Sequence, residues 1–134
     1  RVTLLHGLPG IRELYRDALG QDFIGVSNPA SLYETFGTDA VDKLYADITF
    51  RGRDLFLDCP QARHHVREVP PSDAYQVRLL PARIPYKSDL IVYGDTVALF
   101  AYDEEKTIVR IEHATLADSF RAWFELLWPT AIEA

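Results

Sequence analysis

The sequence predicts an α/β domain built on a mixed β-sheet with helices on both of its faces. Short apolar runs alternate along the chain with stretches whose apolar residues recur every three to four positions, as strands alternate with helices. Gly94 and Asp95 separate two apolar runs and have the composition of a two-residue hairpin turn, which places Val92 opposite Val97. Both faces of this hairpin are apolar, which is typical of a sheet covered on its two sides.

Strand and helix signals alternate in the first half of the chain. Pro9 is expected at the first position of one helix, and Asn28 followed by Pro29 is a cap and first-turn pair for a second. Thr38 is expected to cap a third helix that ends near Gly52. The strands expected in this half cover residues 2–6, 22–27 and 54–57.

The second half predicts mostly antiparallel strands and a closing helix. Thr115 and Asp118 have the spacing of a capping box, and Pro129 stops the helix after residue 128. One face of this helix is apolar and is expected to fill the core, with Trp123 among its packing residues. The members of that face are Leu116, Phe120, Trp123, Phe124 and Leu127. The other expected elements are a short helix at 61–66 and strands at 75–80, 89–102 (the hairpin) and 107–112.

Composition indicates one domain over residues 1–134, with 48% hydrophobic and 25% charged residues. No apolar stretch approaches the roughly 20 residues of a membrane span, and the single cysteine, Cys59, suits a reducing cytoplasm. The net charge of −6 argues against a grip on nucleic acid by this segment alone. The start at Arg1, directly before a strand, suggests a piece of a longer protein.

Common catalytic and metal-binding signatures are missing from the sequence. It has no P-loop, no dinucleotide fingerprint, no H-E-x-x-H motif and no paired C-x-x-C, so we expect no cofactor and no metal. His64 and His65 are adjacent, and adjacent side chains diverge on a helix and on a strand, so we expect two surface histidines rather than a shared metal site.

Several charged residues are candidates for binding a ligand. Arginine side chains can clamp a carboxylate or phosphate with two parallel hydrogen bonds, and the alternative is a set of surface ion pairs and helix-end charges. The candidates are Arg51, Arg53, Lys87, Arg110 and Glu112.

Two stretches carry a family resemblance, the opening of the chain and a second one that runs from the hairpin to the closing helix. The opening V-T-L-L-H-G-L-P-G-I-R-E-L-Y-R-D-A-L, the hairpin D-L-I-V-Y-G-D-T-V-A-L-F and the closing S-F-R-A-W-F-E-L-L-W resemble the phospholipase D-like domain that follows the winged helix in TrmB-like transcription regulators. The resemblance implies a degenerate phospholipase D-like fold. It also implies an effector and dimerisation role, with a DNA-binding winged helix N-terminal to Arg1.

The resemblance also offers a test for catalysis. Active members of the phospholipase D superfamily use an H-x-K-x4-D motif whose histidine is the nucleophile. Aligning its lysine with Lys87 puts Pro85 at the histidine position, and aligning its aspartate with Asp95 puts Ser88 there. Neither register supplies an imidazole, so the sequence predicts that the chain is not an enzyme.

The expected function is therefore a non-catalytic effector and dimerisation domain of a transcription regulator, which senses a small metabolite or sugar. The alternatives are a ligand-free structural dimerisation module and a single-motif phosphodiesterase. The expected partner is a second copy of the chain, because regulators that read two-fold operators are themselves two-fold symmetric. The expected interface residues are Phe100, Tyr102, Leu126 and Trp128.

Overall fold

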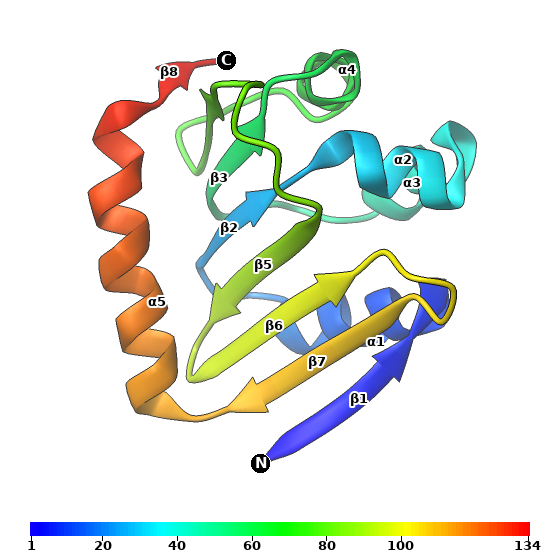
Figure 1. Ribbon diagram of the computed structural model, residues 1–134, viewed down its shortest axis with the longest axis vertical. Coiled ribbons are helices and arrows are strands. Elements are labelled where there is room, and N and C mark those ends of the chain that lie inside the picture. The colour runs from blue at the N-terminus through cyan, green and yellow to red at the C-terminus, as the bar shows by residue number, and fades with distance from the viewer.

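A single mixed sheet of eight strands organises the computed structural model, which describes residues 1–134 (Figure 1). The strand order is β1-β7-β6-β5-β2-β3-β4-β8, and only β2, β3 and β4 run parallel to one another. The predicted mixed sheet is confirmed. Its strands are β1 (Val2–His6), β2 (Phe23–Ser27), β3 (Gly52–Leu57), β4 (Tyr75–Leu80), β5 (Ser88–Tyr93), β6 (Thr96–Ala101), β7 (Thr107–Glu112) and β8 (Ile132–Glu133).

Helices cover the two faces of this sheet unequally. Four of them lie on one face, and α5 alone packs on the other, against β2, β5 and β6. In Figure 1, α1 lies behind β6 and β7, while the near face of β1 and β7 carries no helix. The helices are α1 (Gly7–Ala18), α2 (Pro29–Phe36), α3 (Thr38–Ala46), α4 (Pro60–Glu68) and α5 (Ala114–Leu127), followed by a 3₁₀ turn at Trp128–Thr130.

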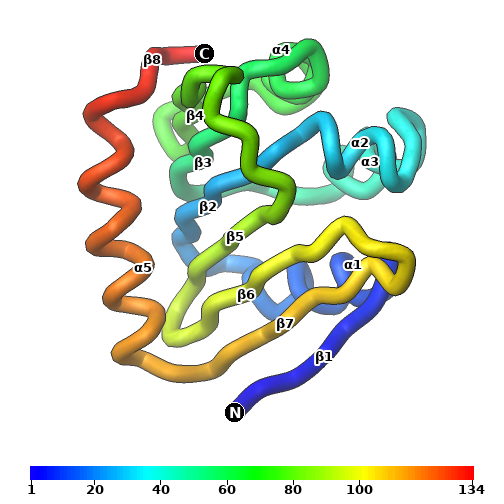
Figure 2. Tube along the Cα trace, in the orientation of Figure 1, coloured from blue at the N-terminus to red at the C-terminus, as the bar shows by residue number.

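The chain runs from one end of the molecule to the other. Figure 2 shows the N-terminus beside the free edge of β1 and the C-terminus at the opposite end, after β8. No helix in the structure has the length and apolar character needed to cross a membrane.

The hairpin of β5 and β6 has the register that its turn predicts. Val92 pairs with Val97 and Leu90 with Leu99. Gly94 has a φ of 53°, which favours glycine in a two-residue turn. Val92 and Val97 are fully buried under α5, while Ile91 and Ala98 are buried under the helices of the other face.

Helix starts match the expected signals only in part. The side chain of Asn28 accepts a hydrogen bond from the Ser31 N–H, and Pro29 opens α2, as predicted. The prediction for α3 is wrong at both ends. Gly37 is the cap and Thr38 is already helical, and the helix ends at Ala46, well before Gly52. The residues after Ala46 are not helical, and Ile48 and Phe50 among them pack into the core between the sheet and helices α1 to α3.

The closing helix also differs from its prediction. The ring of His113 accepts the hydrogen bond from the Leu116 N–H, so the capping box is wrong. Trp123 is 54% exposed, which corrects its expected place in the core. Phe124 is buried as predicted, whereas Leu116 and Leu127 of the predicted face are 40% and 41% exposed. Ala117 and Trp128 face the sheet with Phe124, at spacings of seven and four that keep the three on one side of the helix.

Candidate functional site

A buried carboxyl group lies where β5 begins and β2 ends. Asp89 is 7% exposed and accepts a 2.8 Å hydrogen bond from the backbone N–H of Asn28 and another from the hydroxyl of Tyr102. The Asn28 amide in turn donates to the carbonyl of Tyr86, whose hydroxyl donates to the carbonyl of Ser27. Asp89 is thus held by hydrogen bonds from two separate segments of the chain, and Tyr86 supports one of them through Asn28.

A second buried carboxyl group lies on the neighbouring strand β3. Asp54 is 6% exposed, and the hydroxyl of Tyr75 donates to its Oδ2 at 2.5 Å. Because the Tyr75 proton is used in this way, Nε2 of His65 donates to the Tyr75 oxygen, at 3.2 Å. Gly25 lies against the Asp54 carboxylate, and a Cβ at that position would collide with Oδ1.

Burial changes the ionisation of these groups. It raises the pKa of Asp54 and of Asp89 to about 7, although the hydrogen bonds from Tyr75 and Tyr102 oppose the shift. Burial also lowers the pKa of His65 to about 4, so this imidazole is neutral at pH 7. The two carboxyl groups therefore exchange protons near neutral pH, the range that suits general acid–base chemistry.

The space that these carboxyl groups share is small. A cavity of about 30 Å³ between the sheet and helices α1–α4 is lined by Asp54, Asp89 and His65, together with the rings of Tyr15 and Tyr45. That volume corresponds to about one water molecule, whereas small-molecule sites usually occupy roughly 300–1,000 Å³. The cavity has room for about one water molecule and none for a sugar.

Sequence reasoning did not identify this cluster. Asp54 and Asp89 each stand at or near the start of an apolar strand, where a polar residue is usually the last residue of a turn. The available signal was strand alternation, because Asp89 shares a face with Ile91 and Asp54 with Phe56. His65 lies in the same layer at 3% exposure, which corrects the expectation of two surface histidines.

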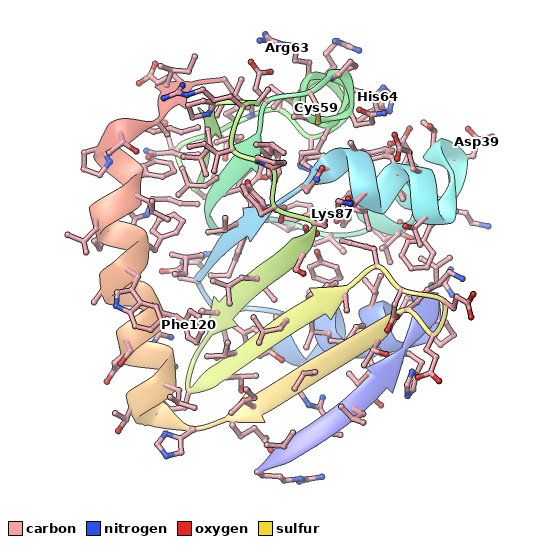
Figure 3. The ribbon with its side chains drawn as sticks, in the orientation of Figure 1. Asp39, Cys59, Arg63, His64, Lys87 and Phe120 are labelled. Atoms are coloured by element: carbon pink, nitrogen blue, oxygen red, sulfur yellow. The ribbon has the colours of Figure 1, made fainter.

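The ligand-binding candidates do not gather into one pocket. Arg51 pairs with Asp22 at 3.4 Å, and Arg53 pairs with Glu125. Lys87 is exposed in the loop before β5 (Figure 3). Because β5 runs antiparallel to β2 and β3, this loop lies at the end of the strands opposite to the two arginines.

The other two candidates lie on β7 and share a face, as their spacing predicts. Arg110 approaches Glu13 of α1 at 3.6 Å, and Glu112 approaches Arg1 at 3.7 Å. Both therefore contact ion-pair partners within the chain.

One open groove does collect arginine side chains. It has a volume of about 490 Å³, lies at the amino ends of β2, β3 and β4, and is lined by Arg51, Arg53 and Arg121 among others. Arg53 stacks on the ring of Trp128, and Arg121 bonds to Asp118 and to a backbone carbonyl. These guanidinium groups are engaged within the chain, and the groove also holds Asp22.

The expected interface residues divide into buried and exposed ones. Phe100 and Trp128 are 6% and 8% exposed and pack in the cores on the two faces of the sheet, so they are not retained as interface residues. Tyr102 is half-buried and holds Asp89. Leu126 is exposed.

A different apolar surface lies uncovered beside α5. Val2 and Leu4 of the edge strand are 65% and 58% exposed, and they share a sheet face with partly exposed residues of β6 and β7. The adjacent side of α5 adds Trp123, at 54% exposure, and Phe120, which Figure 3 labels. We call this surface the open face, and define it as Val2, Leu4, Leu99, Val109, Ile111, Leu116, Phe120, Trp123 and Leu127.

Comparison with known proteins shows the fold. No protein family model matches the sequence, and no curated protein matches it. The whole chain superimposes on part of TrmBL2, an archaeal chromatin protein with a novel mode of DNA binding, with a TM-score of 0.61 and 14% identity. The chain spans 54% of the length of that protein.

Two further solved structures match the chain over nearly their full length. One is Nuc of Salmonella typhimurium, a phospholipase D family member, with a TM-score of 0.68, 12% identity and 97% of its length covered. The other is NucT from Helicobacter pylori, with a TM-score of 0.64, 8% identity and 99% covered. The phospholipase D-like fold and a structural similarity to a TrmB-like protein are therefore shown.

These matches correct the prediction that the chain is not an enzyme. That prediction rested on one missing histidine, whereas the fold matches a phospholipase D family member across 97% of its length. The absence of one motif from a fold that enzymes use does not exclude an activity, so we no longer draw that conclusion.

Proposed function

We propose that this chain is a dimerisation domain of a DNA-binding transcription regulator of the TrmB-like kind. The observation that carries the proposal is the open face, where exposed and half-buried apolar side chains of β1, β6 and β7 share one face of the sheet and those of α5 lie along one side of the helix. An exposed apolar patch of this kind is unusual on a monomer and marks an interaction site. A second copy is the occupant, because a two-fold interface uses the same patch twice and an apolar patch complements itself.

The small cavity favours a structural role over sensing. A buried sugar or similar metabolite needs roughly ten times the volume of the cavity beside Asp54 and Asp89, which is about 30 Å³. Of the two regulator functions that the sequence left open, the ligand-independent dimerisation module is thus better supported. In this proposal DNA is bound by a winged helix in another part of the protein, in keeping with the 54% of TrmBL2 that the chain spans.

Sedimentation velocity over a range of concentrations tests the proposal. The wild type should form a dimer of twice 15.3 kDa at micromolar concentration, and Leu4→Lys should shift it to monomer because a buried lysine would lack a partner. Leu19→Lys is the matched control, since Leu19 is also 58% exposed but lies at the end of α1, away from the open face. A wild type that stays monomeric at every concentration, or a Leu4→Lys variant that dimerises like the control, would reject the open face as the interface.

A phosphodiesterase activity is the second candidate, favoured by the near-complete coverage of Nuc and NucT. The residues available at the start of β5 are Lys87, to hold a phosphate, and Asp89, to exchange a proton near pH 7. Bis(p-nitrophenyl) phosphate is a suitable substrate for the assay. This candidate requires turnover that Lys87→Ala abolishes and Lys106→Ala preserves, and it is rejected if the wild type shows no turnover.

A further inference from the structure

Three side chains of metal-ligand type converge on the outer side of the helical layer. Asp42 comes from α3, and His64 and Glu68 come from α4. Their ligand atoms all lie within 4.8 Å of one another, and Nε2 of His64 is 2.8 Å from Oδ2 of Asp42. Figure 3 shows His64 at the side of α4 that faces α2 and α3.

The geometry of α4 explains why these groups meet. His64 and Glu68 are four residues apart, so their side chains lie above one another on one side of the helix. His65 points to the other side, where it is buried against Tyr75 and fixes the rotation of α4 about its axis. The adjacent histidines therefore have separate roles, and His64 is directed at α3.

Tyr33 of α2 holds the carboxylate of Asp42 in position. Its hydroxyl donates to Oδ1 of Asp42 at 3.2 Å, which leaves Oδ2 directed at His64. The Tyr33 ring also packs edge-on against the His64 ring, with centroids 5.5 Å apart. Partners of this kind hold metal ligands in position, and their loss commonly weakens metal binding about 10–100-fold.

We propose that Asp42, His64 and Glu68 form a binding site for a divalent transition-metal ion of the Zn²⁺ class. Two carboxylates balance the charge of a divalent ion, and the imidazole selects Zn²⁺-like ions over Mg²⁺ and Ca²⁺, which prefer oxygen ligands. Ligand atoms around a tetrahedral zinc ion lie about 3.3 Å apart, and the exposed Glu68 side chain is free to rotate into that range.

The site has consequences for stability and for ligand access. The side chains of Asp42 and His64 are 25% and 28% exposed, so an ion held there is shielded on the protein side and open on the other. Three protein ligands leave the fourth position to solvent or to an anionic group. Because the ligands come from α3 and α4, a bound ion cross-links two helices and stabilises the folded chain.

Isothermal titration calorimetry with ZnCl₂, on protein without a polyhistidine tag, tests this inference. The wild type should bind one equivalent, and its thermal midpoint should rise on saturation. His64→Gln and Glu68→Gln should each weaken binding at least tenfold, and Tyr33→Phe should weaken it about tenfold through the loss of the bond that orients Asp42. MgCl₂ at the same concentration should give no comparable heat.

His6→Gln and Glu104→Gln are the controls. Both side chains are exposed, and they belong to the end of β1 and to the loop between β6 and β7, not to α3 or α4. They should bind Zn²⁺ as the wild type does. Glu68 is exposed, so its variant keeps the fold and remains informative even if the His64 variant is less stable. The proposal is overturned if the wild type shows no saturable binding, or if Glu68→Gln retains the wild-type affinity.

Discussion

Asp54 and Asp89 place carboxyl groups in an apolar layer, and this couples folding to pH. The carboxyl group of Asp54 has a pKa of about 7 in the folded chain, whereas its pKa in the unfolded chain is near 3.8. The folded state therefore binds more protons between these values. The stabilising contribution is fully present below pH 3.8 and is lost as the pH rises through about 7.

We predict that Asp54→Asn removes part of this pH dependence. The variant cannot ionise and still offers an oxygen to the Tyr75 hydroxyl. Its free energy of unfolding should therefore rise relative to the wild type by a few kcal/mol between pH 4 and pH 8. His65, whose lowered pKa of about 4 makes stability fall at acid pH, acts in both proteins and cancels in the difference. Urea unfolding at each pH measures the effect, and Asp95→Asn, at an exposed turn, should show a constant difference. A constant difference for Asp54→Asn as well would contradict the assignment.

The contact between Gly25 and Asp54 gives a second test at the scale of single residues. A Cβ on Gly25 would collide with Oδ1 of Asp54, so Gly25→Ala should destabilise the fold by roughly 1–3 kcal/mol. The cost should shrink in an Asp54→Ala background, where the carboxylate is absent. A double-mutant cycle by urea unfolding measures this coupling. If the two changes prove additive, the carboxylate does not lie over Gly25.

Single residues were the hardest feature to predict from the sequence. The candidates chosen for their charge, such as Arg53 and Glu112, have ion-pair partners within the chain, because isolated surface charges readily find partners. The buried cluster went undetected because the depth of Asp54 and Asp89 depends on how helices α1 to α4 pack over the sheet. No local pattern reports that burial.

Helix α5 and the turn after it show how two tryptophans of one segment can differ. Trp128 is 8% exposed and stacks on Phe124, and its ring centroid lies 5.1 Å from the guanidinium carbon of Arg53 and 4.3 Å from that of Arg78. Trp123 lies on the other side, in the open face, at 54% exposure. The helix therefore uses one aromatic residue for the fold and leaves the other for association.

Alanine substitution should separate these roles. Trp128→Ala should lower the free energy of unfolding by about 3–5 kcal/mol, because it leaves a cavity under both arginines. Trp123→Ala should change it by less than about 1 kcal/mol when measured below the concentration of dimerisation, and should weaken the dimer instead. Urea unfolding and sedimentation give the two readouts. Equal losses of folding stability would contradict this division.

The predictability of each element follows from how local its determinants are. The hairpin of β5 and β6 was predicted in register because its turn and its pairing lie within 14 residues of sequence. The end of α3 was wrong and the buried side of α5 was predicted only in part, because Phe50 and Ala117 are placed by distant partners in the two cores. Periodicity indicated that α5 is amphipathic, but its apolar arc is wider than the side that the sheet buries.

At the scale of the whole molecule, the sequence predicted helices on both faces but not their unequal distribution. The apolar alternation of β1 and β7 is the same whether a helix or a second copy covers Leu4 and Val109. Sequence pattern therefore reports that a face is apolar and does not report what covers it. In the structure α5 leaves that part of the sheet uncovered, which is why the proposed interface differs from the one predicted.

Net charge at this scale bears on DNA binding. The chain carries a charge of −6, so phosphate groups are repelled on average, and the proposed regulator binds DNA through another part of the protein. We predict that the isolated chain forms no sub-micromolar complex with duplex DNA in a mobility-shift assay at low salt, where electrostatic binding is strongest.

The surface best suited to contradict this prediction is the groove between α1 and α3, which has a volume of about 270 Å³. Its cations Arg12, Arg16 and Lys43 have no carboxylate within ion-pair distance. A tight complex that Arg12→Ala and Arg16→Ala together abolish would place DNA binding in this chain, at a groove that three cations line together with one carboxylate, Asp47.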